Sequence, residues 1–417
     1  MPIQRGHGRL RNLAAAAAVA VALACSAGPA AALPAQRTPA QAATGSLQRH
    51  LGALVSDGAT AALGQVRERG VAVWRGSAGT SDLARRPPVR PDGSFRIGSV
   101  TKSFVAAVVL QLAGEGRLRL DDPIGRHLPG VVRDADAVSV RQILNHTSGI
   151  YDYTEDPRVL EDPADPAALE RWLSTGRWRT WTPAALVALA DDPAHAAYFP
   201  PGTGWRYSNT DYLLAGLLIE KVTGHTYAQE VTRRILRPLH LTHTRVPGTS
   251  VRLPEPHAHA YLLRPGHKPV DITEQNMSAA GPAGEMISTA DDLTRFTAAL
   301  LGGRLLGPAQ QRELTTAVDL GPDGGYGLGL ERARLSCTTV WGHGGGMYGS
   351  TALSFGTPDG RRQLAVSFNP SGIFPTAPQT TTSHTLLETA FCGEPRSPAA
   401  TKTAISAVPG GGHRHRQ

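Results

Sequence analysis

The stretch Ser99-Val100-Thr101-Lys102 decides how this sequence is interpreted. Residues three apart on a helix lie on the same face, so the hydroxyl of Ser99 and the amine of Lys102 are predicted to be neighbours. Gly114 and Gly116 mark the predicted end of this helix. Ser99 would then lie at a helix N-terminus, where unpaired N–H groups favour developing negative charge. The apolar stripe that predicts the helix is formed by Phe104, Val105, Val108, Val109 and Leu112.

Two further clusters supply groups that suit the same chemistry. Tyr207-Ser208-Asn209 carries a phenol and a carboxamide on alternate residues, and His343-Gly344-Gly345 places an imidazole beside backbone that a substrate can approach. Burial of Lys102 would favour its neutral form, which can accept the serine proton. Each cluster alone is also typical of a capped helix, a turn or a loop. Their joint occurrence predicts an acyl-transfer site.

Together, the three clusters resemble the signature of the serine β-lactamase and penicillin-binding superfamily, Ser-x-x-Lys, Ser/Tyr-x-Asn and Lys-Thr-Gly or a variant. The tyrosine in the second element is similar to the class C β-lactamase, DD-peptidase, D-aminopeptidase and esterase branch. Residues 45–393 carry the resemblance, which implies an α/β (α+β) fold: an antiparallel sheet flanked by helices, plus an all-helical subdomain. Further similar stretches are Asn145-His146-Thr147-Ser148-Gly149, Phe199-Pro200-Pro201-Gly202 and Ser288-Thr289-Ala290-Asp291-Asp292-Leu293.

The resemblance also implies roles for individual residues. Ser99 would be the nucleophile and Lys102 its base, while Tyr207 would return a proton to the leaving group. Asn209 would hold a substrate carbonyl together with Lys102. The oxyanion hole would be formed by the N–H groups of Ser99 and Gly346. The substrate-binding residues would be Asn209, His343, Gly344, Gly345 and Gly346.

The third element departs from Lys-Thr-Gly. His343 replaces the cation and is expected to titrate near neutral pH, and Gly344 replaces the hydroxyl. A histidine here resembles DD-peptidases and D-aminopeptidases more than β-lactamases. DD-carboxypeptidases of this type bind the substrate carboxylate with hydroxyls and an upstream arginine. Gly344 and Gly346 offer no hydroxyl, although Arg332 and Arg334 precede the strand, so the substrate class stays open.

The leading hypothesis is an exported serine hydrolase that works through an acyl-enzyme on Ser99 and acts as a D-alanyl-D-alanine carboxypeptidase. The alternatives are a D-aminopeptidase or small-ester esterase, then a β-lactamase. A catalytically silent relative that binds peptidoglycan or self-assembles is the non-enzymatic alternative. The expected partner is a small peptide or ester, with a peptidoglycan stem peptide as one candidate. The sequence predicts no cofactor, no metal site and no nucleic-acid partner, and it leaves the oligomeric state open.

The N-terminus is typical of an export signal. Three arginines precede an apolar run at residues 13–24, and Ala32 ends a small-residue cleavage site. Residues 1–32 are therefore predicted to be a signal peptide, 33–44 a flexible linker, 45–393 the hydrolase domain and 394–417 a disordered tail. The protein is therefore predicted to be secreted and to have no stable membrane span. A retained anchor and lipidation of Cys25 are the alternatives.

Charge and cysteine usage agree with this organisation. The net charge is +8, and the first 44 residues and the tail from Glu394 carry seven of these charges, so no nucleic-acid surface is indicated. If Cys25 leaves with the signal peptide, Cys337 and Cys392 remain. In an oxidising compartment these two are expected to form a disulfide, with two buried thiols as the alternative.

A coarse secondary structure completes the prediction. Strands are predicted at both ends of the domain and should join one antiparallel sheet, with a hairpin at Thr357-Pro358-Asp359-Gly360. The aromatic segment with Trp172, Trp178 and Trp181 either roofs the cleft or packs the subdomain. The predicted strands are 64–66, 71–74, 337–341, 350–355 and 363–368, and the predicted helices are 184–190, 211–222 and 289–301.

Overall fold

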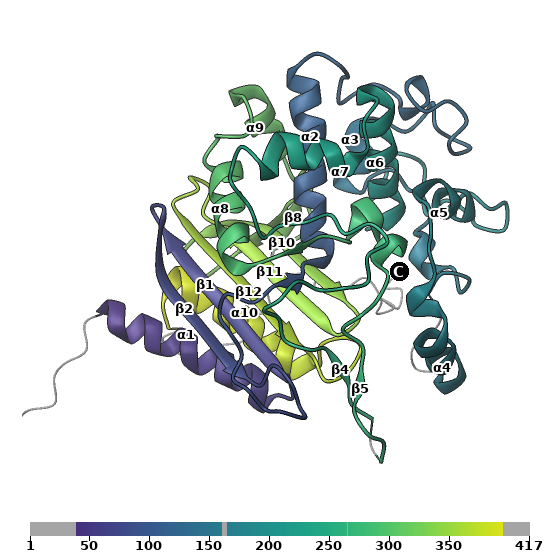
Figure 1. Cartoon of the computed structure of the whole chain (residues 1–417). Coiled ribbons are helices and arrows are strands. Elements are labelled where there is room, and N and C mark those ends of the chain that lie inside the picture. Colours follow the sequence, from purple (N-terminus) through teal and green to yellow (C-terminus); the bar gives the residue numbers. More distant parts are fainter. Residues whose placement is uncertain (1–38, 161–164, 265, 323, 395–417) are drawn as a thin grey trace, which may run out of the picture. The chain divides into compact units, whose positions relative to one another are not determined.

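The computed structural model describes residues 39–160, 165–264, 266–322 and 324–394 (Figure 1). Its largest sheet is antiparallel and has the strand order β2-β1-β12-β11-β10-β9-β8-β7. The two ends of the domain meet in this sheet, because β1 pairs with β12 along its whole length. The predicted antiparallel sheet with strands from both ends is thus confirmed. The strands are β1 (Ala61–Glu68), β2 (Val71–Gly79), β7 (Val318–Asp319), β8 (Gly324–Tyr326), β9 (Glu331–Arg334), β10 (Thr339–Met347), β11 (Ser350–Gly356) and β12 (Arg362–Asn369).

Helices α1 (Pro39–Ser56) and α10 (Ala377–Cys392) pack against each other and against one face of this sheet, as Figure 1 shows. Leu47, Leu51 and Leu54 recur at helical spacing and are buried in the cluster beneath the sheet. This burial holds the second half of α1, which begins at Pro39, against the sheet. The segment 33–44, predicted as a flexible linker, is therefore helical from residue 39, and that part of the prediction is wrong.

The opposite face of the sheet is covered by α8 (Ala290–Leu301), which packs on β1, β11 and β12. Helix α2 (Thr101–Gly114) is buried on nearly all sides, and the ring of its Phe104 stacks on Phe296 of α8 at 3.6 Å between centroids. Helices α6 (Asn209–Thr223), α7 (Tyr227–Val231) and α9 (Pro308–Leu314) pack on α2, and α3 (Val140–Asn145) and α5 (Pro183–Ala190) pack on α6. Helix α4 (Pro166–Ser174) lies apart from α2 and belongs to a separate apolar cluster (Figure 1). Two short sheets, β3 (Phe95–Arg96) with β6 (Ile287–Ser288) and β4 (Tyr261–Leu262) with β5 (Val270–Asp271), complete the fold.

Strand β10 is longer than the sequence predicts. The predicted strand ends at Trp341 before a loop, but the observed strand continues through four glycines and His343 to Met347. Gly344 and Gly345 pair with Leu353 and Ala352 of β11. Glycine has no side chain to give it a strand preference, so the run of strand-favouring residues in the sequence ends before the observed strand does. Here the ladder to β11 holds the glycines extended.

A disulfide joins Cys337, just before β10, to Cys392 at the end of α10, with 5.6 Å between the Cα atoms. We expect the double variant Cys337→Ser/Cys392→Ser to lose about 4 kcal/mol of unfolding free energy, because the bond closes a long loop in the unfolded chain. Urea unfolding of this variant, and of the wild type with and without reductant, measures the difference. Equal urea midpoints for all three samples would contradict the expectation.

The predicted signal peptide, residues 1–32, lies outside the described residues, and so do residues 395–417 of the predicted tail. Within the described part of the chain, no helix combines the length and the apolar character needed to cross a bilayer.

Candidate active site

Ser99 lies in a 3₁₀ turn (Gly98–Val100) that leads directly into α2. The turn is pressed against β10, since a Cβ atom on Gly98 would lie only 2.7 Å from the backbone nitrogen of Gly346. Gly98 also has a φ of +51°, a conformation that side chains disfavour. Ser99 is buried by this contact. Ser99 therefore lies at a helix N-terminus, as predicted, in a tight turn that immediately precedes the first residue of α2.

Lys102 points back to Ser99, with 3.0 Å between its Nζ and the serine Oγ. The same nitrogen lies 2.8 Å from Asn209 Oδ1 and 2.7 Å from the carbonyl oxygen of Ala283. Burial lowers the pKa of Lys102 from 10.5 to about 7, although three nearby carboxyl groups oppose the shift. A neutral amine donates two hydrogen bonds, here to Asn209 and Ala283, and keeps its lone pair for the Ser99 hydroxyl. This geometry suits proton transfer from Ser99.

Asn209 is the first residue of α6 and is held by a residue that the sequence did not single out. Its Nδ2 donates to Asp152 Oδ2 at 2.9 Å, which turns Oδ1 toward Lys102. Burial raises the pKa of Asp152, and hydrogen bonds from Thr154 and Asn209 oppose that rise. Asp152 follows the Asn145–Gly149 stretch in a Tyr-Asp-Tyr triplet, and no spacing rule identifies it in advance.

Tyr207 completes the group around the lysine. Its ring centroid lies 4.8 Å from Lys102 Nζ, 4.2 Å from the ring of His146 and 6.2 Å from that of His343. Burial raises the pKa of Tyr207 well above its usual range, while the nearby Ser99 hydroxyl opposes the rise. Among the described residues, no atom meets the geometry of a hydrogen bond with this buried hydroxyl. A substrate atom beside Ser99 is a suitable partner for it.

The loop before Tyr207 rests on a second buried cluster. His146 adopts a left-handed conformation, with a φ of +63°, and its Nδ1 lies 3.0 Å from Asp211 Oδ2. The hydroxyl of Ser148 donates to the other oxygen of Asp211 at 2.6 Å. The stretch that resembles the superfamily thus supports Tyr207 and Asn209 from behind, while His146 Nε2 has no hydrogen-bond partner among the described residues.

Strand β10 presents a free edge next to Ser99. Its pairing with β9 ends at Gly342 and Glu331, and beyond this point no described strand covers that side. Amide groups alternate in direction along a strand, so Gly344 and Gly346 both point their N–H to this edge. The Gly344 N–H is taken by Glu331 Oε1 at 3.2 Å. The Gly346 N–H lies beside the serine turn, so it and the Ser99 N–H can meet one oxygen atom.

His343 differs from its prediction. It is buried, its Nε2 lies 2.9 Å from the hydroxyl of Tyr326, and its Nδ1 contacts the Gly344 carbonyl. Burial and the charge of Lys102 lower the pKa of His343 to about 3. The expectation that His343 titrates near neutral pH is therefore wrong, because that expectation took no account of burial. With its pKa lowered this far, the imidazole of His343 is neutral at neutral pH.

The charged residues near His343 also differ from expectation. The guanidinium groups of Arg332 and Arg334 contact Asp319, at 2.6 and 3.4 Å. The acid Glu331 instead lies next to the histidine, with 3.3 Å between Oε1 and His343 Nδ1. Burial raises the pKa of Glu331 to about 8, against the effects of the Gly344 N–H and of Lys102.

The three tryptophans of the aromatic segment have different environments. Trp172 packs edge-on to Tyr348 at 4.6 Å, close to the β10–β11 turn, while Trp181 packs against the main core. Trp178 is 39% exposed. Two of the three indoles therefore contribute packing, and one of these two also borders the hairpin that carries the free edge.

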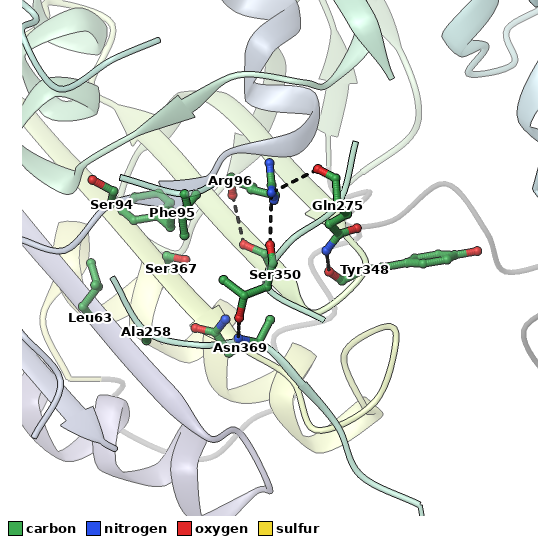
Figure 2. Close-up of a pocket in the computed structure, with 13 residues that line it drawn as sticks. Leu63, Ser94, Phe95, Arg96, Ala258, Gln275, Tyr348, Ser350, Ser367 and Asn369 are labelled. Carbon is green, nitrogen blue, oxygen red and sulfur yellow. Dashed lines mark hydrogen bonds between the residues drawn. The ribbon is translucent and has the colours of Figure 1, made fainter. Parts of the chain in front are cut away.

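The segment that leads to Ser99 is anchored at Arg96. Figure 2 shows its side chain beside Gln275 and Ser350, where Nη2 donates to the Gln275 carbonyl at 3.3 Å and Ser350 Oγ donates to the Arg96 carbonyl at 3.0 Å. The cavity in this view has a volume of about 20 Å³, enough for about one water molecule. It is therefore too small to be the substrate site.

Comparisons with known proteins identify the family. The family model described as Beta-lactamase matches residues 48–378. Penicillin-binding protein 4* of Bacillus subtilis (strain 168) is 26% identical over 71% of this chain, which spans 65% of that relative's length.

Two solved structures are similar over nearly their whole length. A D-stereospecific amidohydrolase from Streptomyces sp. has 44% identity and a TM-score of 0.75, over 84% of this chain and 99% of that one. The D-amino acid amidase of Ochrobactrum anthropi SV3 in complex with D-phenylalanine has 27% identity and a TM-score of 0.71, over 83% of this chain and 98% of that one. The family match and the shared fold lead to one conclusion: this chain belongs to the Beta-lactamase family, within the serine β-lactamase and penicillin-binding superfamily.

Proposed function

We propose that this protein hydrolyses amides of D-amino acids through an acyl-enzyme on Ser99. The observation that carries the proposal is the contact of a buried, nearly neutral Lys102 amine with Ser99 Oγ at 3.0 Å. The identity of 44% with a D-stereospecific amidohydrolase supports the substrate class. This is the D-aminopeptidase-like alternative of the sequence analysis, placed ahead of the carboxypeptidase.

The residues then have these roles. Lys102 accepts the proton of Ser99 as Oγ forms a bond to the substrate carbonyl carbon, and the N–H groups of Ser99 and Gly346 stabilise the oxyanion. The C–N bond breaks, and the leaving amine takes a proton delivered through Tyr207. Water then attacks the ester carbon and gives up one proton to Lys102 and Tyr207, which pass that proton to Ser99 Oγ as the ester bond breaks and the acid is released. Asn209, held by Asp152, positions the side-chain amine of Lys102 and the substrate carbonyl.

The D-alanyl-D-alanine carboxypeptidase remains the second candidate, supported by the similarity to penicillin-binding protein 4*. It would need a positive group for the substrate carboxylate. Arg332 and Arg334 are occupied by Asp319, and the charged group next to His343 is the acid Glu331. This arrangement favours the amidase. Export remains part of the proposal through the predicted signal peptide.

The test compares D-phenylalanine amide, L-phenylalanine amide and a D-alanyl-D-alanine peptide as substrates of the purified mature protein. We expect hydrolysis of the D-amide to exceed that of the L-amide, and the Ser99→Ala protein to be inactive. Hydrolysis of the D-alanyl-D-alanine peptide alone, with a lasting benzylpenicillin adduct in the intact mass, would overturn the amidase in favour of the carboxypeptidase.

The activity should depend on the protonation of Lys102. We expect kcat/KM for D-phenylalanine amide to rise with pH along a limb centred near 7, because only the neutral amine accepts the serine proton. The titration of the substrate's own α-amine is measured separately and divided out. His343 does not contribute in this range, since its pKa is about 3.

Glu285 provides the control for this profile. Burial raises its pKa to about 7, so it titrates in the same range as Lys102. The Glu285→Gln protein should keep the rising limb, since the carboxyl of Glu285 has no part in the proton transfer. A flat profile in Glu285→Gln would assign the limb to Glu285 and contradict the role of Lys102.

A further inference from the structure

The position of Tyr207 indicates on which side of Ser99 the leaving group lies. In the proposed function, on which this inference rests, Tyr207 delivers the proton to the departing nitrogen. The ring of His343 lies 6.2 Å from that of Tyr207, and Glu331 is close enough to raise the pKa of Tyr207. The leaving group therefore departs beside the first residues of the free β10 edge.

Glu331 blocks the backbone donor on this side. At a free strand edge, an exposed N–H is the natural partner of a substrate carbonyl or carboxylate. The Gly344 N–H is such a group, but Glu331 Oε1 already accepts it at 3.2 Å. The neighbouring Gly346 N–H is assigned to the oxyanion. A carboxylate on the leaving group would therefore find no free donor in the edge that begins at Gly344.

The charges on this side also disfavour a carboxylate. While the substrate binds, Lys102 is neutral and gains a proton only as Ser99 attacks, and Arg332 and Arg334 are held by Asp319. Glu331 itself is buried. A leaving-group carboxylate that is buried here without a cation would be strongly destabilised, and an ionised Glu331 next to it would add repulsion.

We propose that Glu331 selects the leaving group. It rejects a leaving amine that carries a carboxylate, such as the C-terminal residue of a free peptide, and accepts ammonia or an uncharged amine. The substrate class is thereby narrowed to D-aminoacyl amides and amidated peptides. Glu331 acts on the leaving group through charge and through its hold on Gly344, and it takes no part in the proton transfers.

A matched substrate pair tests this proposal. D-Phe-D-Ala and D-Phe-D-Ala amide share the acyl group and the scissile bond, and they differ in the charge of the leaving amine. The released leaving groups, D-alanine and D-alanine amide, are quantified by chromatography. We expect the wild type to prefer the amidated dipeptide by at least about tenfold in kcat/KM. In Glu331→Gln, which keeps an oxygen for the Gly344 N–H, the preference should fall at least about threefold.

The control variant is Glu68→Gln, which makes the same change at a partly exposed carboxylate on β1 of the same sheet. It should keep the wild-type preference. Because each preference is a ratio measured within one preparation, partial unfolding of a variant cancels. An unchanged ratio in Glu331→Gln, or equal rates for the two dipeptides in the wild type, would overturn the role of Glu331. Failure of the wild type to hydrolyse D-phenylalanine amide would overturn the proposed function instead.

The pH dependence of the ratio provides a second readout. The titratable groups that face Glu331 are Lys102 of α2, His343 of β10, Tyr326 of β8 and Tyr207. The pKa of Glu331 is about 8, so its charge develops above neutral pH. The wild-type preference for the amidated dipeptide should therefore increase from about pH 7 to about pH 9. The same increase in Glu331→Gln would overturn the proposal.

Discussion

The Lys102→Met protein should acylate at least about 10⁴-fold more slowly than the wild type. The substitution keeps the length of an apolar side chain and removes the only amine in contact with Ser99 Oγ among the described residues. It also removes the hydrogen bonds to Asn209 and to the Ala283 carbonyl, so the base and the positioning contacts are lost together. The acylation rate is measured with D-phenylalanine amide under single-turnover conditions.

Lys221→Met is the control, because it makes the same change at an exposed lysine on the far end of α6. It should acylate at the wild-type rate. The double variant Ser99→Ala/Lys102→Met should be no slower than Ser99→Ala, since residues that act as one unit are not additive. A Lys102→Met protein with more than about a tenth of wild-type activity would contradict the assignment of the base.

The Gly345→Ala protein should lose about 3 kcal/mol of stability and at least about 10²-fold of activity. A Cβ atom at this position would lie 2.0 Å from the Ile97 carbonyl oxygen and 2.9 Å from the Ser99 nitrogen. Both neighbours are backbone, so the clash is relieved only if β10 and the serine turn move apart. That movement separates the two N–H groups assigned to the oxyanion. Urea unfolding and kcat/KM measure the two effects.

Gly52→Ala is the matched control for this substitution. Gly52 lies in α1, and a Cβ atom there would have no neighbour within 4 Å. Alanine is the better helix former, so this variant should gain up to about 1 kcal/mol of stability and keep its activity. A Gly345→Ala protein as stable and as active as Gly52→Ala would show that the backbone contact is not needed.

The parts of the site that could be predicted from the sequence are those whose residues lie close together in short motifs. Ser99 and Lys102 are neighbours because helical spacing alone places them so, and the disulfide between Cys337 and Cys392 follows from counting cysteines. Tyr207 and Asn209 were placed by resemblance, since no periodicity connects them to Ser99. The sheet was predictable because alternating strands lie at both ends of the domain.

The residues that were missed act through long-range contacts. Asp152 reaches Asn209 across 57 positions, and Glu331 meets Gly344 only because β9 pairs with β10. The error on His343 has the same origin, since its neutral state depends on burial beside Tyr326 and Lys102. Such effects depend on what the fold brings together, and no local pattern carries that information.

The buried amine of Lys102 also sets a limit on how stable the fold can be. In the unfolded chain the amine keeps its proton up to about pH 10.5, but in the folded protein it releases it near pH 7. Between these values the unfolded state binds more protons, so this group's contribution to stability improves as the pH rises and is least favourable below 7. At neutral pH the fold is therefore weakened by the same desolvation that makes the amine a base. The low pKa of Lys102 Nζ thus favours catalysis and lowers the free energy of unfolding at the same time.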